Sequence, residues 1–378
     1  MGEGQADLRR PDGDGTGVIA VIPIDLDGSG CYRVLFPSRE LRRNGIPSAM
    51  PPAQTARTGD GGYLFRFQLV PPEQMAKRIT TLVVQRSIQE LWALEYMPAL
   101  RRLGVRVVFE TDDLMVGLPK WHPAREGLEN ATAWIEKGLR GSLDMMTKAM
   151  NASDTVVVST PYLAEVHGEH HPDVRVVRNR LCREMWEDVP MQYEQERRRF
   201  RIGYMGSASF HRGDLEVLRG VIGPWLERHP DVEFVACGDG RTHDLLGVPE
   251  RQRVTVAPLA FHHMELPDIV AVMDVGLVPL DLCAFNEAKS CLKGMEYAAA
   301  GIPCIASPTS EYLWWAEQNG GCMIADRNRP AAWRSCLDAF YEEDALRRAV
   351  GATARRDVEK HWIQDNWQEW RDAWTASG

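Results

Sequence analysis

Short apolar runs alternate with helix-like segments along most of this 378-residue chain, and this alternation limits the possible folds more than any other feature of the sequence. The run at 18–24 is followed by a helical segment that ends at Asn44-Gly45. The same order repeats with apolar runs at 80–85, 105–109, 154–158 and 174–177. Strands that alternate with helices form βαβ units and a mainly parallel sheet. The sequence therefore predicts an α/β fold.

A charged segment at 183–200 interrupts the alternation, which then restarts. The later apolar runs lie at 201–204, 232–236, 254–256, 275–280 and 302–306, and helices are expected at 213–228, 288–300, 310–318, 329–341 and 343–375. We predict two doubly wound Rossmann-like domains in tandem, with ligands outside the carboxyl ends of their strands. The expected divisions are a disordered tail at 1–17, an N-terminal domain at 18–182 with a loop at 46–62, a linker at 183–200, a C-terminal domain at 201–345 and a C-terminal helix at 346–378.

Composition narrows the classes of partner. Lys and Arg number 44 against 53 Asp and Glu, so the net charge of −9 argues against a protein that coats duplex DNA. No apolar run approaches the ~20 residues of a membrane span, and the polar N-terminus does not resemble a secretory signal. We expect a cytoplasmic protein without stable membrane insertion. Its eight Cys contain no CxxC pair, which favours buried, reduced thiols over disulfides or zinc.

The segment 286–303 contains the most informative pattern. Lys289, Lys293 and Glu296 are spaced i, i+4, i+7, so they are expected on one face of a helix, with Lys289 and Ser290 in its first turn. Cations are unfavourable at the positive end of a helix dipole unless an anion binds there. A diphosphate held by the two lysines and Ser290 would remove this conflict, and Glu296 would accept hydrogen bonds from a ribose. The alternative is a solvated amphipathic helix in which Glu296 pairs with Lys293.

The same segment resembles the donor site of GT-B glycosyltransferases, especially the family 4-like retaining enzymes (glycosyl transferases group 1). The resemblance rests on Lys-Ser-x-x-Lys-x-x-Glu-Tyr followed by Gly-x-Pro-x-Ile-Ala-Ser within 285–307. Segments 32–46, 107–119, 154–166 and 201–218 are similar to other parts of that fold. The resemblance implies a last helix that crosses back to the N-terminal, acceptor-binding domain. It also implies metal-independent transfer of a sugar, with retention, from a UDP- or GDP-sugar to an acceptor hydroxyl.

A second set of donor-site candidates follows the strand at 201–204. Gly206 and Ser207 would let the backbone approach a phosphate closely, and His211 and Arg212 come next. Arg212 is a candidate second phosphate cation, and we group it with Lys289 and Asp112 as candidate catalytic residues. The alternative is an ordinary strand-to-helix turn that exposes a His-Arg pair.

One position departs from the resembled family. Many family 4 enzymes have two Glu eight positions apart, but Ala288 stands eight positions before Glu296. Glu287 is adjacent and is expected to point elsewhere. The identity of the bound sugar and of the group that holds it therefore stays open.

The N-terminal half offers candidates for the acceptor. Asp112 and Asp113 follow the run at 105–109, and Gln85-Arg86 follows the run at 80–85. Asp112 is a candidate acceptor ligand or base, and helix capping by either Asp is the alternative. Asp25-Leu26-Asp27 spells the DxD of metal-dependent enzymes, but a GT-B protein neutralises the diphosphate with cations, so we expect no metal.

Two other classes of protein remain open. One is a non-catalytic, GT-B-like scaffold that binds nucleotide sugars, and the other is a nucleotide-sugar epimerase or hydrolase. The sequence does not identify the acceptor, which we expect to be a carbohydrate, a lipid-linked precursor, a protein or a phage component. Arg greatly outnumbers Lys, a skew typical of GC-rich genomes, so a bacterial or phage origin is expected.

Overall fold

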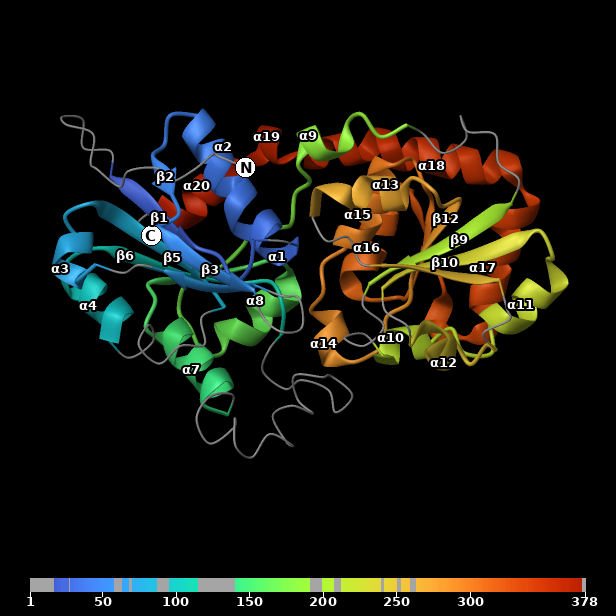
Figure 1. The fold of residues 1–378 in the computed structure, drawn as a ribbon, viewed down its shortest axis with the longest axis horizontal. Helices are drawn as coiled ribbons and strands as arrows, with labels where there is room; N and C mark the ends of the chain where they lie inside the picture. The colour runs from blue at the N-terminus through green and yellow to red at the C-terminus, as the bar shows by residue number, and fades with distance from the viewer. Residues whose placement is uncertain are drawn as a thin grey trace. The chain divides into compact units, whose positions relative to one another are not determined.

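The chain folds into two compact units, each built around one sheet (Figure 1). The computed structural model describes residues 17–26, 28–57, 63–67, 70–86, 95–114, 140–190, 199–206, 212–238, 241–249, 253–258 and 263–375. Unit 1 comprises Met1–Val116, Ala131–Asn179 and Ile363–Gly378, and unit 2 comprises Gly117–Asn130 and Arg180–Trp362. Within the described ranges, no helix combines the length and apolar character that crossing a membrane requires.

The sheet of unit 1 has six parallel strands in the order β2-β1-β5-β6-β7-β8. These are β1 (Val18–Ile22), β2 (Ser48–Ala49), β5 (Ile79–Gln85), β6 (Arg106–Thr111), β7 (Thr155–Val158) and β8 (Val174–Val176). All five residues of β1 are buried, as expected for a parallel strand covered on both faces. Because β1 pairs with β2 on one side and β5 on the other, the strand order reverses between β1 and β5. Ligands of such sheets bind at this point, outside the carboxyl ends of the strands.

Local signals in the sequence set the helices of unit 1. In α8 (Pro161–Gly168), Thr160 caps the N-terminus through its hydroxyl, 3.2 Å from the Leu163 amide, and Pro161 occupies the first helical position. Helix α2 (Phe36–Arg43) ends as predicted, because Gly45 adopts a φ of +81°. The other helical segments are α1 (Gly28–Gly30), the π-helical turn η1 (Cys31–Leu35), α3 (Pro72–Met75), α4 (Met97–Arg102), α7 (Arg140–Asn151), α19 (Ile363–Asn366) and α20 (Gln368–Thr375).

The last helix, α20, packs on the sheet of unit 1. It contacts β5 and β7, and it buries Trp370 and Trp374 completely. In Figure 1 this red helix lies among the blue elements of the N-terminal segment. The expected C-terminal segment 346–378 is thus divided, because α18 (Asp344–Val358) contacts helices of unit 2.

The sheet of unit 2 also has six parallel strands, in the order β11-β10-β9-β12-β13-β14. These are β9 (Phe200–Met205), β10 (Val232–Gly238), β11 (Val254–Pro258), β12 (Val275–Val278), β13 (Cys304–Ala306) and β14 (Cys322–Ile324). In chain order this is 3-2-1-4-5-6, the arrangement of dinucleotide-binding domains, with the reversal between β9 and β12. The predicted fold class, two Rossmann-like α/β domains, is confirmed.

Helices cover this second sheet and bury large aromatic side chains such as Trp225 and Trp333. Helix α18 packs against α15 (Leu292–Ala299), α16 (Ser310–Asn319) and α17 (Pro330–Glu342). The remaining helical segments are α9 (Arg183–Trp186), α10 (Arg212–Glu216), α11 (Ile222–Arg228), α12 (Thr242–Leu246), η5 (His263–Glu265), α13 (Leu266–Val270), α14 (Ala284–Glu287), η6 (Asp326–Asn328) and η7 (Glu359–His361).

Three expectations about single elements were wrong. The loop expected at 46–62 contains β2 and a strand, β3 (Ala53–Arg57), which pairs antiparallel with β4 (Tyr63–Phe67). The helix expected at 213–228 is broken into α10 and α11, because Gly220 has a φ of +72° and Pro224 has no amide to donate. The helical stretch expected at 343–375 is interrupted after His361, where Trp362 is extended.

Within the expected linker 183–200, α9 forms and buries Trp186. Residues 1–16 of the expected tail lie outside the described residues.

Candidate active site

The segment with the two lysines lies at the start of α15, but its helix begins later than predicted. Helix α14 ends at Glu287, and the Lys289 amide bonds back to the Asn286 carbonyl at 3.1 Å. Cys291 is the N-cap of α15, so Lys289 and Ser290 precede the helix and do not lie in its first turn. The expected common helical face therefore holds only for Lys293 and Glu296. The spacing of the lysines and Glu296 predicted a helix correctly, but it placed the first residue of that helix too early.

Lys293 lies directly over the end of β9. A Cβ placed on Gly206 would stand 2.9 Å from the Lys293 Nζ and 2.8 Å from the Tyr204 Oη. The same Nζ lies 5.2 Å from the centroid of the Tyr204 ring. A side chain at position 206 would displace the ammonium, so Gly206 is required for this close approach. The result is a cation at the carboxyl end of β9, beside the reversal point of the sheet.

The other candidates of this segment are near Lys293 in the sequence. The Lys289 Nζ lies 4.4 Å from the centroid of the Phe285 ring. Glu296 is one turn beyond Lys293 in α15 and is only 5% exposed. Ser290 lies between the two lysines, in the turn that precedes the helix.

Small residues in the strands let α15 approach the sheet closely. A Cβ on Gly276 of β12 would stand 2.5 Å from the Tyr297 ring of α15. The Tyr297 hydroxyl lies 3.3 Å from the Gly203 carbonyl of β9 and 3.4 Å from the Leu277 carbonyl of β12. Tyr297 thus ties α15 to both strands of the reversal point, and this fixes where Lys293 lies.

The remaining donor-site candidates are described only in part. Ser207 and His211 lie outside the described residues. Arg212 begins α10, but its side chain is also outside them. The structure therefore brings together Gly206 and Lys293, and it leaves the positions of the other three side chains as predictions.

The structure shows the surroundings of Ala288 and of the acid next to it. Ala288 is completely buried, and the neighbouring acid, Glu287, is directed to α16. The Glu287 Oε1 accepts hydrogen bonds from the Ser310 amide, at 3.0 Å, and from the Ser310 hydroxyl. Glu287 therefore stabilises the N-terminus of another helix, where a carboxylate is favourable. Glu287 thus points to another helix, as expected from its place beside Ala288 in the sequence.

The candidates of unit 1 meet at the carboxyl edge of its sheet. Arg86 follows β5, and its Nη1 lies 2.9 Å from the Asp113 Oδ2. Its Nε lies 3.4 Å from the Asp112 Oδ1. Burial lowers the pKa of Arg86, but the carboxylates of Asp112, Asp113 and Asp25 outweigh burial, so that its pKa lies above the ordinary value. Arg86 has a φ of +42°, which is uncommon for a residue other than Gly.

Hydrogen bonds connect this ion pair to β1. The Gln85 Oε1 accepts from the Ile24 amide at 3.0 Å, and the Gln85 Nε2 donates to the Ser29 hydroxyl at 2.9 Å. Ser29 in turn donates to the Asp112 Oδ2 at 2.6 Å. Asp25 accepts from the Gly30 amide at 2.8 Å. We call these residues the Arg86 cluster: Asp25, Ser29, Gln85, Arg86, Asp112 and Asp113.

A helix capped by Asp112 or Asp113 would involve residues from 115 onward, which lie outside the described residues, as does Asp27 of the DxD tripeptide. Asp25 accepts from the first turn of α1 and η1. In the described part of the chain, no group of three or more His, Cys, Asp or Glu side chains is arranged to hold a metal ion.

Sequence reasoning missed a buried ion pair behind the Arg86 cluster. The Arg33 Nε donates to the Glu110 Oε1 at 2.7 Å, and neither side chain is exposed. Burial raises the pKa of Glu110 to about 7, although Arg33 opposes this rise. Arg33 also bonds to the Val177 carbonyl and the Asn179 side chain. Charged residues are rarely buried, and no local pattern distinguishes these two from surface residues.

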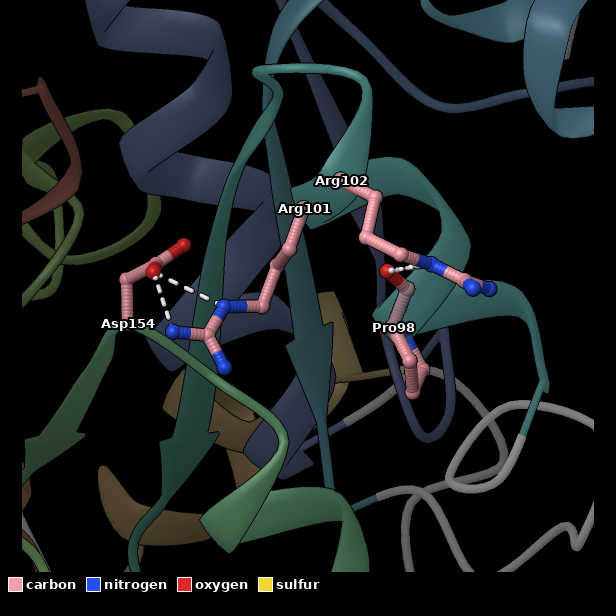
Figure 2. A pocket seen from close by; sticks show the side chains of 4 residues that line it. All are labelled: Pro98, Arg101, Arg102 and Asp154. Atoms are coloured by element: carbon pink, nitrogen blue, oxygen red, sulfur yellow. Dashed lines mark hydrogen bonds and ion pairs between the residues drawn. The ribbon is translucent and has the colours of Figure 1, made fainter.

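An open depression lies at the opposite, amino edge of the same sheet (Figure 2). Its lining residues are Pro98, Arg101, Arg102 and Asp154. Arg101 pairs with Asp154 at 2.8 Å, and Arg102 donates to the Pro98 carbonyl at 3.3 Å. Asp154 precedes β7, so this depression is away from the strand ends that carry the Arg86 cluster.

Comparisons with known proteins agree with this architecture. Residues 199–343 match the family described as glycosyl transferases group 1. Among solved structures, sucrose-phosphate synthase from Thermosynechococcus elongatus is 14% identical with a TM-score of 0.62, covering 94% of this chain and 98% of that one. HepE from Anabaena, solved with UDP and glucose, is 12% identical with a TM-score of 0.61 and the same coverage. A glycosyltransferase from Rickettsia africae is 11% identical, with a TM-score of 0.63 over 94% and 96%.

A search of curated proteins finds no match. The sheet orders, the reversal point beside Lys293 and the family match over most of unit 2 nevertheless point to one assignment. The chain has the GT-B fold, and its residues 199–343 match the glycosyl transferases group 1 family.

Proposed function

We propose that this protein transfers a sugar from a nucleotide-diphosphate sugar to an acceptor hydroxyl. The observation that carries the proposal is the position of Lys293. This residue belongs to the first turn of α15, and its ammonium lies close to Gly206 at the end of β9. Backbone amides at a helix N-terminus and a nearby cation together form a site for a phosphate. The reversal point of a doubly wound sheet is also where nucleotides bind.

The chemistry explains why a diphosphate needs such a site. In the transfer, the bond between the anomeric carbon and a diphosphate oxygen breaks, and a bond between the same carbon and the acceptor oxygen forms. The leaving diphosphate keeps the bonding electrons, and the acceptor hydroxyl loses its proton. Lys293, Lys289 and the helix amides would stabilise the charge that develops on the leaving group.

The remaining roles in unit 2 are proposals that follow from the family. Ser290, Ser207 and Gly206 would bind phosphate oxygens, and Arg212 and His211 would add donors. Glu296 is buried and one turn from Lys293, so it would accept hydrogen bonds from the ribose diol. The two lysines and the helix amides would neutralise the diphosphate, so we propose that the transfer needs no metal. Retention is proposed from the resemblance to the family 4-like enzymes. HepE, which has a similar fold, was solved with UDP, and this supports a UDP-sugar as a donor to test first.

The acceptor would bind at the Arg86 cluster of unit 1, where polar side chains gather at the reversal point of the first sheet. Asp112 is the candidate to receive the acceptor proton, because its carboxylate lies at this edge and is 16% exposed. Gln85, Arg86 and Asp113 would orient the acceptor.

A second candidate function is a scaffold that binds nucleotide sugars without transferring them. Ala288 favours it, because the acid that many family 4 enzymes have at this position is replaced by a buried methyl group, and Glu287 is directed to α16. An enzyme that hydrolyses or epimerises the donor would retain the same nucleotide site.

The first experiment is a thermal-shift screen of nucleoside diphosphates and their sugars, with and without Mn²⁺, on the wild type and on Lys293→Ala. A ligand that binds only the native state raises the melting temperature. Metal-independent stabilisation by one nucleotide that is lost in the variant supports the donor site. If no nucleotide stabilises the protein, or if only Mn²⁺ complexes do, the proposal is wrong.

Product analysis then separates the candidate functions. The wild type is incubated with the stabilising nucleotide sugar and a panel of carbohydrate acceptors. A glycosylated acceptor identifies a transferase, a new sugar isomer an epimerase, and release of the free sugar with every acceptor a hydrolase. Binding without turnover identifies a scaffold.

A further inference from the structure

The Arg86 cluster contains more acid than base. Its single guanidinium faces Asp113 and Asp112, at 2.9 and 3.4 Å, and Asp25 adds a third carboxylate to its surroundings. Both carboxylates that touch Arg86 are partly exposed, Asp113 by 25% and Asp112 by 16%. A ligand that reaches this edge therefore meets carboxylate oxygens as well as the guanidinium.

The Arg86 guanidinium already forms ion pairs with these carboxylates. Phosphate binding by Arg uses its parallel N–H donors in a fork. Here one branch of that fork is on Asp113, and the Nε faces Asp112, which also accepts from Ser29. A phosphate would have to displace a carboxylate from Arg86 and would then lie beside the displaced charge. Like charges brought together at an interface are unfavourable.

The same edge suits the groups of an uncharged saccharide. Carboxylates accept hydrogen bonds, so they bind hydroxyl groups, and Gln85 and Ser29 extend the polar surface toward β1. Two apolar side chains flank Asp25 in the chain, Ile24 at 37% exposed and Leu26 at 38%. Carboxylates beside exposed aliphatic groups match the two kinds of surface that a sugar ring presents, its hydroxyls and its C–H face.

We infer that the acceptor presents neutral hydroxyl groups, and no phosphate, to the Arg86 cluster. The inference rests on the proposed function, because it assumes that this edge binds the acceptor. Asp112 and Asp113 are then specificity-determining residues: by occupying Arg86 they exclude phosphorylated acceptors. Sucrose-phosphate synthase has the same fold, and its name shows that related folds do handle sugar phosphates, so the fold alone does not decide the point.

The test compares acceptors in matched pairs, glucose with glucose 6-phosphate and fructose with fructose 6-phosphate. Release of nucleoside diphosphate is measured with the donor found in the thermal-shift screen. We expect the neutral member of a pair to be used at least about tenfold better, the size of one unfavourable charge contact of about 1.4 kcal/mol. In Asp113→Asn the preference shrinks, because Arg86 is released from one carboxylate. A phosphorylated sugar used as well as its neutral partner by the wild type overturns the inference.

A binding measurement covers the case in which no sugar of the panel is an acceptor. Hydrogen exchange of the segments 79–86 and 106–114 is followed with inorganic phosphate as the probe. We expect no protection in the wild type and protection in Asp113→Asn or in the double variant Asp112→Asn/Asp113→Asn. Protection of the wild type, or of none of the three proteins, overturns the inference.

Asp154→Asn is the matched control, since it removes one carboxylate from an Arg–Asp pair at the opposite edge of the same sheet (Figure 2). It should leave both readouts unchanged. Failure of the inference is distinguishable from failure of the proposed function. If the nucleotide sugar does not bind at all, the proposed function fails. If it binds and phosphorylated sugars are preferred, only the inference fails.

Discussion

The indole ring of Trp370 lies 5.6 Å from the guanidinium carbon of Arg33, and both side chains are completely buried. One residue comes from the last helix of the chain and the other from the π-helical turn η1 near its start. The contact covers the Arg33–Glu110 pair, whose acid lies two residues before Asp112 in the sequence. The end of the chain thus completes the support behind the Arg86 cluster.

Replacing Trp370 with Ala should destabilise unit 1 by about 3–5 kcal/mol, since a fully buried indole leaves a large cavity and uncovers a buried charge pair. Urea unfolding followed by circular dichroism measures the change. Trp367→Ala is the control, because Trp367 is only partly buried and stacks on Arg371. Equal losses in the two variants would contradict the structure.

The Arg33–Glu110 pair should make stability depend on pH. The pKa of Glu110 is raised from 4.5 to about 7 by burial, so between these values the folded state binds more protons than the unfolded state. Stability should therefore fall as pH rises from 4.5 to 7, by up to about 3 kcal/mol for this group. Urea midpoints across this range should show the fall in the wild type and a smaller fall in Glu110→Gln. Identical slopes would show that Glu110 does not titrate there.

Lys293→Ala should weaken nucleoside diphosphate binding about 10- to 100-fold, because a charge-assisted hydrogen bond contributes about 1.5–3 kcal/mol. Calorimetric titration of UDP and GDP gives the affinity. Lys360→Ala is the matched control, since Lys360 is 68% exposed and pairs with Asp357 in η7 and α18. The donor-site assignment is wrong if both variants bind the nucleotide as the wild type does.

Gly276→Ala should cost about 1–3 kcal/mol or more, because its new Cβ would stand 2.5 Å from the Tyr297 ring. Since Tyr297 positions α15, nucleotide affinity should fall as well. Gly168→Ala serves as a control, because a Cβ there meets nothing within 4 Å. Thermal melting and calorimetry of the two variants check both effects. A harmless Gly276→Ala would mean that α15 does not depend on this contact.

Much of the fold could be predicted from the sequence, because both sheets are parallel and buried on both faces. Such strands appear as continuous apolar runs, as β1 and β5 do. Strand β3 was missed because its segment is rich in Pro, Gly and Thr, and its partner β4 lies beyond a Gly-rich stretch of the sequence. Whether such a strand forms depends on its pairing with another segment, and local composition does not reveal that pairing.

The proximity of two donor-site candidates agrees with the sequence patterns that selected them, and their roles stay predictions. Gly206 and Lys293 were selected by a turn and a helical spacing, and the structure brings them together. Lys289 was assigned to the helix too early, since periodicity locates a helix better than it locates the cap. Arg33 and Glu110 could not be found this way, because their burial depends on strands and helices distant in the sequence.

The division of unit 1 has a consequence for the order in which the chain is completed. Unit 1 contains most of the first 179 residues, but it also includes Ile363–Gly378, which the ribosome adds after the residues of unit 2. All residues of unit 2 have been synthesised by Trp362, before α20 exists. Unit 1 can therefore be completed only after unit 2 has been synthesised, although domains at the N-terminus are commonly the first to fold. Until α20 has been synthesised, the nascent protein lacks the two indole rings, Trp370 and Trp374, with which this helix packs near β5 and β7.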